Sequence, residues 1–139
     1  MDVLLVEDQA VTLQVYAATV RKAFDGARVH TAADLPDALQ IAARRALDLV
    51  LLDLTLPSCS GIVALERFRR EFPGVPVLVV SASEEPDRAQ ACLAAGARGY
   101  VAKTSALTQL PNAMRAAMAG EPYTLTCRPT ASPATSRGI

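Results

Sequence analysis

Short apolar runs alternate along this chain with longer segments whose apolar residues recur every three or four positions. Two of the runs, at 49–52 and 77–80, contain no alternating polar residues. Continuous apolar strands are typical of a parallel sheet that is covered on both faces. The sequence therefore predicts five strands, at residues 3–6, 28–31, 49–52, 77–80 and 99–101.

The segments between these runs have the 3.6-residue period of amphipathic helices. In the first of them, Leu13, Tyr16 and Val20 recur at helical spacing. The expected helices cover residues 9–24, 35–45, 62–71, 86–95 and 106–118. Asp34 stands where it would cap the second helix, and Gly96 stands where it would end the fourth.

Five strand–helix units in regular alternation predict an α/β fold, a doubly wound three-layer sandwich around a five-stranded parallel sheet. After Gly120 the periodicity stops, and the sequence becomes rich in Pro, Ser, Thr and Ala. We therefore expect one domain over residues 1–122 and a flexible tail, or the start of a linker, over residues 123–139.

The composition narrows the classes of function. The 139 residues carry 14 basic and 14 acidic side chains, 51% are hydrophobic and 4% are aromatic, with no tryptophan. Zero net charge and few aromatic side chains argue against direct binding of nucleic acid or of an anionic membrane. No signal peptide or membrane-spanning run is readable.

The cysteines and the single histidine do not suggest a metal centre. Cys59, Cys92 and Cys127 are widely spaced, without a Cys-x-x-Cys pair, and His30 is the only histidine. We expect structural or incidental roles for all four residues and a reducing, cytoplasmic location.

Polar side chains follow four of the predicted strands, at the point where each strand ends. Glu7 and Asp8 follow the first strand, Asp53 the third, Ser81 the fourth and Lys103 the fifth. In a doubly wound sheet these positions converge on the edge where ligands bind. Taken singly, each has an ordinary explanation, since acids after a strand can cap the next helix and the others fit a turn or a solvated surface.

Taken together, the three carboxylates suggest a cation site. Clustered carboxylates repel one another unless a cation lies among them. Mg²⁺ suits a few carboxylates together with water and phosphate oxygens. Lys103 would then be a counter-charge for a phosphoryl group across the cleft.

Four motifs, in this order, resemble the receiver domain of two-component response regulators. The similarity covers about residues 2–121. It is carried by residues 3–9 (VLLVEDQ), 51–57 (LLDLTLP) with Gly61, 80–82 (VSA) and 96–103 (GARGYVAK). Residues 96–103, and 119–123 (AGEPY), are most similar to receivers that precede a LuxR-type helix-turn-helix.

The resemblance implies roles for the acidic residues. Asp53 would be the phosphoacceptor, and Glu7 and Asp8 the acidic pair that positions Mg²⁺. In receivers the metal also contacts the phosphoacceptor carboxylate and a backbone carbonyl two residues later, which is that of Thr55 here.

The resemblance also implies a strand order of 2-1-3-4-5, the flavodoxin-like receiver fold. Ser81 would be the conserved-type hydroxyl, Lys103 the phosphate-pairing lysine and Tyr100 the aromatic switch residue. A structural alternative for Tyr100 is a half-buried strand aromatic whose hydroxyl stays in water.

The function implied is a phosphorylation-activated signalling switch. A histidine kinase or a phosphotransfer protein would donate a phosphoryl group to Asp53, without turnover of an independent substrate. The response would change the surface of 86–95, 99–101 and 106–118 and control an output, which we expect to be transcription. That surface, or the helices at 9–24 and 106–118, would support a homodimer.

The sequence leaves two other functions open, and it differs from the usual receiver pattern at one position. The chain could be a stand-alone receiver that acts on a protein partner or in a phosphorelay. A haloacid-dehalogenase-type phosphatase is remote, because it needs a second aspartate where Thr55 stands. Thr104 follows Lys103 where many receivers have proline, often after a cis bond, which leaves the geometry of that peptide bond open.

Overall fold

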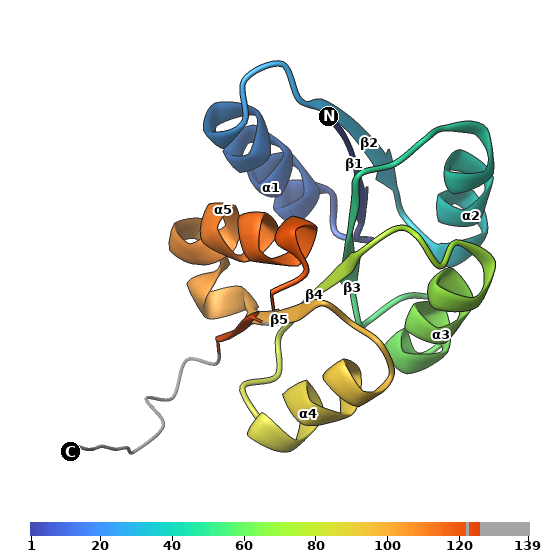
Figure 1. Cartoon of the computed structure of the whole chain (residues 1–139), viewed down its shortest axis with the longest axis vertical. Coiled ribbons are helices and arrows are strands. Elements are labelled where there is room, and N and C mark those ends of the chain that lie inside the picture. The colour runs from blue at the N-terminus through green and yellow to red at the C-terminus, as the bar shows by residue number, and fades with distance from the viewer. Residues whose placement is uncertain (122, 126–139) are drawn as a thin grey trace.

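The computed structural model describes residues 1–121 and 123–125 and contains one parallel sheet between two layers of helices (Figure 1). Its strands are β1 (Asp2–Val6), β2 (Arg28–Ala32), β3 (Leu49–Asp53), β4 (Val77–Ser81), β5 (Gly99–Ala102) and β6 (Tyr123–Leu125). All pair in parallel, in the order β2-β1-β3-β4-β5-β6. The five predicted strands and their order are confirmed.

The sixth strand was not predicted. β6 pairs with β5, with Gly99 opposite Tyr123 and Val101 opposite Leu125. A three-residue edge strand has too little pattern to be recognised in a sequence. The sheet thus extends into the segment assigned to the tail, and the rest of that predicted tail lies outside the described residues.

The five predicted helices are present with small shifts at their ends. They are α1 (Ala10–Ala23), α2 (Leu35–Arg44), α3 (Gly61–Glu71), α4 (Pro86–Ala94) and α5 (Lys103–Ala119). The largest difference is in α5, which begins three residues before the predicted start because it follows β5 without a connecting loop. Among the described residues, no helix is long and apolar enough to cross a membrane.

Each face of the sheet has its own apolar core, as the continuous apolar strands require. Leu4 and Val6 of β1 pack in the core under α2, α3 and α4, whereas Val3 and Leu5 pack in the core under α1 and α5. Figure 1 shows the same division of the helices between the two sides of the sheet. Because side chains alternate across a strand, a sheet covered on both faces needs apolar residues at every position.

Local capping fixes two of the connections. The Asp34 carboxylate accepts a hydrogen bond from the backbone N–H of Leu35 at the start of α2, and another from the Ser58 hydroxyl. Gly96 follows the end of α4 with φ +108°, a left-handed conformation that favours glycine. Both predicted caps are therefore present.

The residues predicted to be structural behave accordingly where they are described. Cys59 and Cys92 are free thiols, and Cys92 is buried, while Cys127 lies outside the described residues. The His30 Nε2 atom is 3.0 Å from Asp2 Oδ1 on the neighbouring strand. Hydrogen bonds from Arg28 and then from His30 hold the pKa of Asp2 well below its usual range.

Gly61, the first residue of α3, offers a direct test of packing against the connection that follows Asp53. A Cβ atom at Gly61 would overlap the backbone Cα of Leu54, which the fold cannot move cheaply. We expect Gly61→Ala to lower the free energy of unfolding by about 1–3 kcal/mol, measured by urea denaturation. Gly74→Ala is the control, because a Cβ at Gly74 meets nothing within 4 Å. Equal stabilities of the two variants would contradict this packing.

Candidate functional site

The polar residues predicted to converge do meet at the carboxyl edge of the sheet. Glu7 and Asp8 follow β1, and Asp53 ends the adjacent strand β3. Ser81 ends β4, the next strand along, and Lys103 opens α5 directly after β5. The parallel arrangement places all of these chain positions at one edge, although they are up to 96 residues apart in the sequence.

Three carboxylates form the centre of this site. Oxygen atoms of Glu7, Asp8 and Asp53 lie within 4.8 Å of one another. Glu7 and Asp53 are 3% and 4% exposed, whereas Asp8 is open to solvent. Burying charged carboxylates is unfavourable unless cations or hydrogen-bond donors compensate them.

Lys103 supplies part of this compensation. Its Nζ atom lies 3.0 Å from Glu7 Oε1 and 3.4 Å from Asp53 Oδ2. The other carboxylate oxygens accept backbone hydrogen bonds: Glu7 Oε2 from Gln9 N–H, and Asp53 Oδ1 from Thr55 N–H. The site is thus built from one ammonium group and two backbone donors facing the buried acids.

One carboxylate oxygen in the cluster lacks a hydrogen-bond donor among the described residues. Glu7 Oε1 is buried and, despite the short contact with Lys103, has no hydrogen bond of acceptable geometry to a described residue. An oxygen of this kind, beside two more carboxylates, suits a hard divalent cation with oxygen ligands. The residues present therefore fit Mg²⁺.

Contacts with the acids change the protonation behaviour of Lys103. Partial burial, the largest single influence, lowers the pKa of this ammonium, but the contacts with Glu7 and Asp53 outweigh it and raise the pKa overall. A raised pKa means that the ion pair stabilises the folded chain below about pH 10.5, and that this contribution is lost as pH rises through the folded-state pKa.

Ser81 and Tyr100 are linked through the connection after β4. Ser81 Oγ accepts a hydrogen bond from Ser83 N–H, at 3.1 Å. Tyr100 is fully buried, and its hydroxyl donates to the Ser83 carbonyl at 2.7 Å. The alternative in which Tyr100 is half-buried with its hydroxyl in water is wrong.

The junction between β5 and α5 has Thr104 where many receivers have a proline after the lysine. The Lys103–Thr104 peptide bond is trans, like every other bond in the described residues. The Thr104 hydroxyl donates to Glu84 Oε2, at 3.2 Å. This settles the geometry that the sequence left open.

Sequence reasoning missed Tyr16 as a neighbour of the site. Together with Glu7 and Asp53 it lines a small cavity of about 10 Å³ on the α1 side of the sheet. Burial raises the pKa of Tyr16, and Lys103 opposes this shift. One indication of this position was present in the sequence, the hydroxyl group that Tyr16 places on a helix face otherwise made of apolar residues such as Leu13 and Val20.

Comparisons with known proteins agree with this geometry. The model of the response regulator receiver domain family matches residues 3–115. A LuxR-family two-component response regulator from Aurantimonas sp. SI85-9A1 has a similar structure, with a TM-score of 0.82, 28% identity, and coverage of 91% of this chain and 89% of that one.

Two curated relatives show the settings in which such domains occur. The KDP operon transcriptional regulatory protein KdpE of Escherichia coli is 39% identical over 119 residues, 84% of this chain and 51% of KdpE. The sensor histidine kinase AruS of Pseudomonas aeruginosa is 34% identical over 118 residues, which are 82% of this chain and 12% of AruS. The chain spans about half the length of the curated regulators it matches.

The raised pKa of Lys103 can be measured directly, since the chain has only two lysines, Lys22 and Lys103. We expect carbon-13 NMR of the lysine side chains to show Lys103 titrating above pH 10.5, with Lys22 as an internal reference. Glu7→Gln should lower the Lys103 midpoint, because it removes the closest negative charge. A midpoint at or below pH 10.5, or one that Glu7→Gln leaves unchanged, would contradict the ion pair.

Proposed function

Because the chain belongs to the receiver domain family of two-component response regulators, we propose that it is a switch activated by phosphorylation of Asp53. The observation that carries this proposal is the position of Asp53. It ends β3, is 4% exposed, and shares the ammonium of Lys103 with the buried acid Glu7.

The proposed reaction is phosphoryl transfer from a phosphohistidine to Asp53. A carboxylate oxygen of Asp53 attacks phosphorus, the new O–P bond forms as the N–P bond breaks, and the leaving imidazole takes up a proton. Lys103, already 3.4 Å from Asp53 Oδ2, offsets negative charge on the transferred group. The Ser81 hydroxyl, at the end of the adjacent strand, donates a hydrogen bond to a phosphoryl oxygen.

Mg²⁺ is the proposed cofactor, held by Glu7, Asp8, Asp53 and the backbone carbonyl of Thr55. When bound, it would neutralise charge on the phosphoryl oxygens and on the acids themselves. Asp8 is the one acid of the three that is exposed, so a cation bound to the cluster would remain in contact with solvent on that side. The Asp53 oxygen that accepts from Thr55 N–H is kept oriented by that hydrogen bond.

We propose that the signal leaves the site through Ser83. The Ser81 hydroxyl would turn toward the phosphoryl group and give up its hydrogen bond with Ser83 N–H, while Tyr100 holds the Ser83 carbonyl. Tyr100 is already buried here, so phosphorylation would shift the balance between this inward position and an outward one. The surface of α4, β5 and α5 changes as a result.

The wider role follows from the relatives and is part of the proposal. The donor is a histidine kinase or a phosphotransfer protein in the cytoplasm, and a homodimer would form through α4–β5–α5 or through α1 and α5. We propose that a longer regulator controls transcription, and that this chain supplies its receiver domain, which runs past the predicted end at residue 122 to include β6. The match to a segment of a sensor histidine kinase supports a phosphorelay receiver as the second candidate.

Labelling with acetyl phosphate and Mg²⁺ tests the phosphoacceptor. Intact-mass analysis should find one phosphoryl group per chain, with saturation while acetyl phosphate remains, because Asp53 is modified once rather than turning over substrate. Asp53→Asn should abolish labelling, and Asp25→Asn, which alters an exposed acid outside the cluster, should not. Full labelling of Asp53→Asn would contradict the assignment.

Thermal unfolding tests the cation site independently. Mg²⁺ at ten times its Kd should stabilise the folded chain by about 1.4 kcal/mol, because the unfolded chain lacks the cluster. Asp8→Asn should remove most of this effect and leave the Mg²⁺-free chain at least as stable, since it removes carboxylate repulsion. An unchanged response to Mg²⁺ in Asp8→Asn, with Asp25→Asn as the control, would argue against this ligand set.

A further inference from the structure

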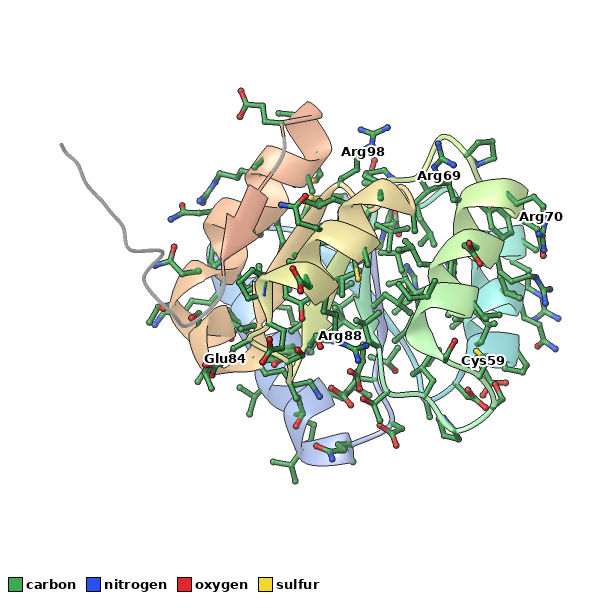
Figure 2. All side chains as sticks on the ribbon, turned by 90° about the horizontal axis from the view of Figure 1, so that it is seen from below. Cys59, Arg69, Arg70, Glu84, Arg88 and Arg98 are labelled. Atoms are coloured by element: carbon green, nitrogen blue, oxygen red, sulfur yellow. The ribbon has the colours of Figure 1, made fainter. Side chains whose placement is uncertain are left out.

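A second concave site lies at the opposite edge of the sheet from Asp53. It has a volume of about 490 Å³ and is bounded by the C-terminal end of α3, the start of β4 and the connection from α4 to β5. Figure 2 shows Arg98 and Arg69 together at one end of α4 and α3, whereas Cys59, Glu84 and Arg88 lie toward the other end. None of the residues that line this pocket takes part in the phosphorylation chemistry proposed above.

The two arginines of this pocket, Arg69 and Arg98, have no partner in the part of the chain that the structure describes. Among the described residues, neither the Arg69 nor the Arg98 guanidinium forms an ion pair or a hydrogen bond. Of the acids nearby on α3, Glu71 is paired with Arg67, and Glu66 lines an adjacent hollow with Arg69 and Arg70. The pocket therefore presents two guanidinium groups whose N–H donors can bind an anion.

Packing on the backbone holds the stem of Arg69 in place. A Cβ atom at Gly96 would overlap Cδ and Nε of Arg69, so the stem of this arginine packs directly on the glycine. The Arg98 backbone N–H donates to the Val77 carbonyl at 2.9 Å, which fixes the position of its Cα, and its Nη1 atom lies near Gly120 at the end of α5. A side chain packed as that of Arg69 is loses less freedom on binding a ligand than a freely rotating one does.

Charge at helix ends explains only part of this arrangement. Arg69 and Arg70 are in the last turn of α3, where basic side chains interact favourably with the helix dipole. Arg98 lies outside the helices, although its Nη1 atom is near Gly120, the C-cap of α5, where the dipole also favours a cation. The dipole does not require a glycine beneath Arg69 or a hollow lined by both arginines, and a ligand site accounts for these two features.

We propose that this pocket binds a small organic phosphate, with Arg69 and Arg98 gripping its phosphate groups. Pro73 and the half-buried Val75 contribute apolar surface to the lining, which would suit a ring or alkyl body attached to the phosphate. The volume falls within the range of small-molecule sites, about 300–1,000 Å³, and is too large for one phosphate ion. The chain's own residues 126–139 are an unsuitable occupant, because they carry Arg128 and Arg137 and no acidic side chain.

Titration of the full chain with ADP, followed by amide NMR without Mg²⁺, tests this proposal. We expect saturable shifts at Val75, Val77 and 96–98, and similar shifts with pyrophosphate but not with adenosine. Arg69→Gln and Arg98→Gln should each weaken ADP binding about tenfold or more, since each removes a charge-assisted contact. Arg88→Gln is the matched control, with the same loss of charge at the other end of α4.

The outcomes separate this site from the phosphoacceptor site. Shifts only at residues 7, 8, 53 and 103, no saturable binding of ADP or pyrophosphate, or equal weakening in Arg88→Gln would each overturn the proposal. Arg98→Gln should still be labelled at Asp53, and Asp53→Asn should still bind ADP. Loss of ADP binding in Asp53→Asn would overturn the separation of the two sites.

Discussion

The Lys103 ammonium between Glu7 and Asp53 is the interaction on which the site depends. Two carboxylates are almost fully removed from water there, within reach of a third, and one lysine and two backbone N–H groups compensate them. The arrangement balances charge incompletely, because Glu7 Oε1 remains buried without a hydrogen bond to any described residue. A site of this kind gives up stability in exchange for affinity for a cation and for a group that carries negative charge.

The sheet makes this cluster possible. β1 and β3 are adjacent, so their carboxyl ends bring Glu7, Asp8 and Asp53 together without any long loop. Rigid strands, buried on both faces, hold the chain positions of the acids, while Lys103 is fixed by the first turn of α5. The apolar strands thus supply both the core and the geometry of the site.

Much of this organisation was predictable, because it follows from local patterns. The apolar runs at 49–52 and 77–80 required a covered parallel sheet, and that sheet fixed where Asp53 and Ser81 would lie. The inward position of Tyr100 was not predictable, since it depends on the carbonyl of Ser83, 17 residues away in the sequence. The arginine pocket also escaped prediction, because Arg69 meets Gly96 only through the packing of α3 beside the α4–β5 connection.

Zero net charge conceals two local concentrations of charge. Buried acids gather at the carboxyl edge of the sheet, and two arginines without a partner among the described residues lie at the amino edge. A crystal structure with Mg²⁺ and beryllium fluoride would show directly whether Asp53 accepts the phosphoryl group. We expect a fluoroberyllate on the Asp53 carboxylate, contacted by Lys103 and Ser81, with Mg²⁺ on Glu7, Asp8, Asp53 and the Thr55 carbonyl. A fluoroberyllate on another residue, or a cation bound away from these acids, would contradict this assignment.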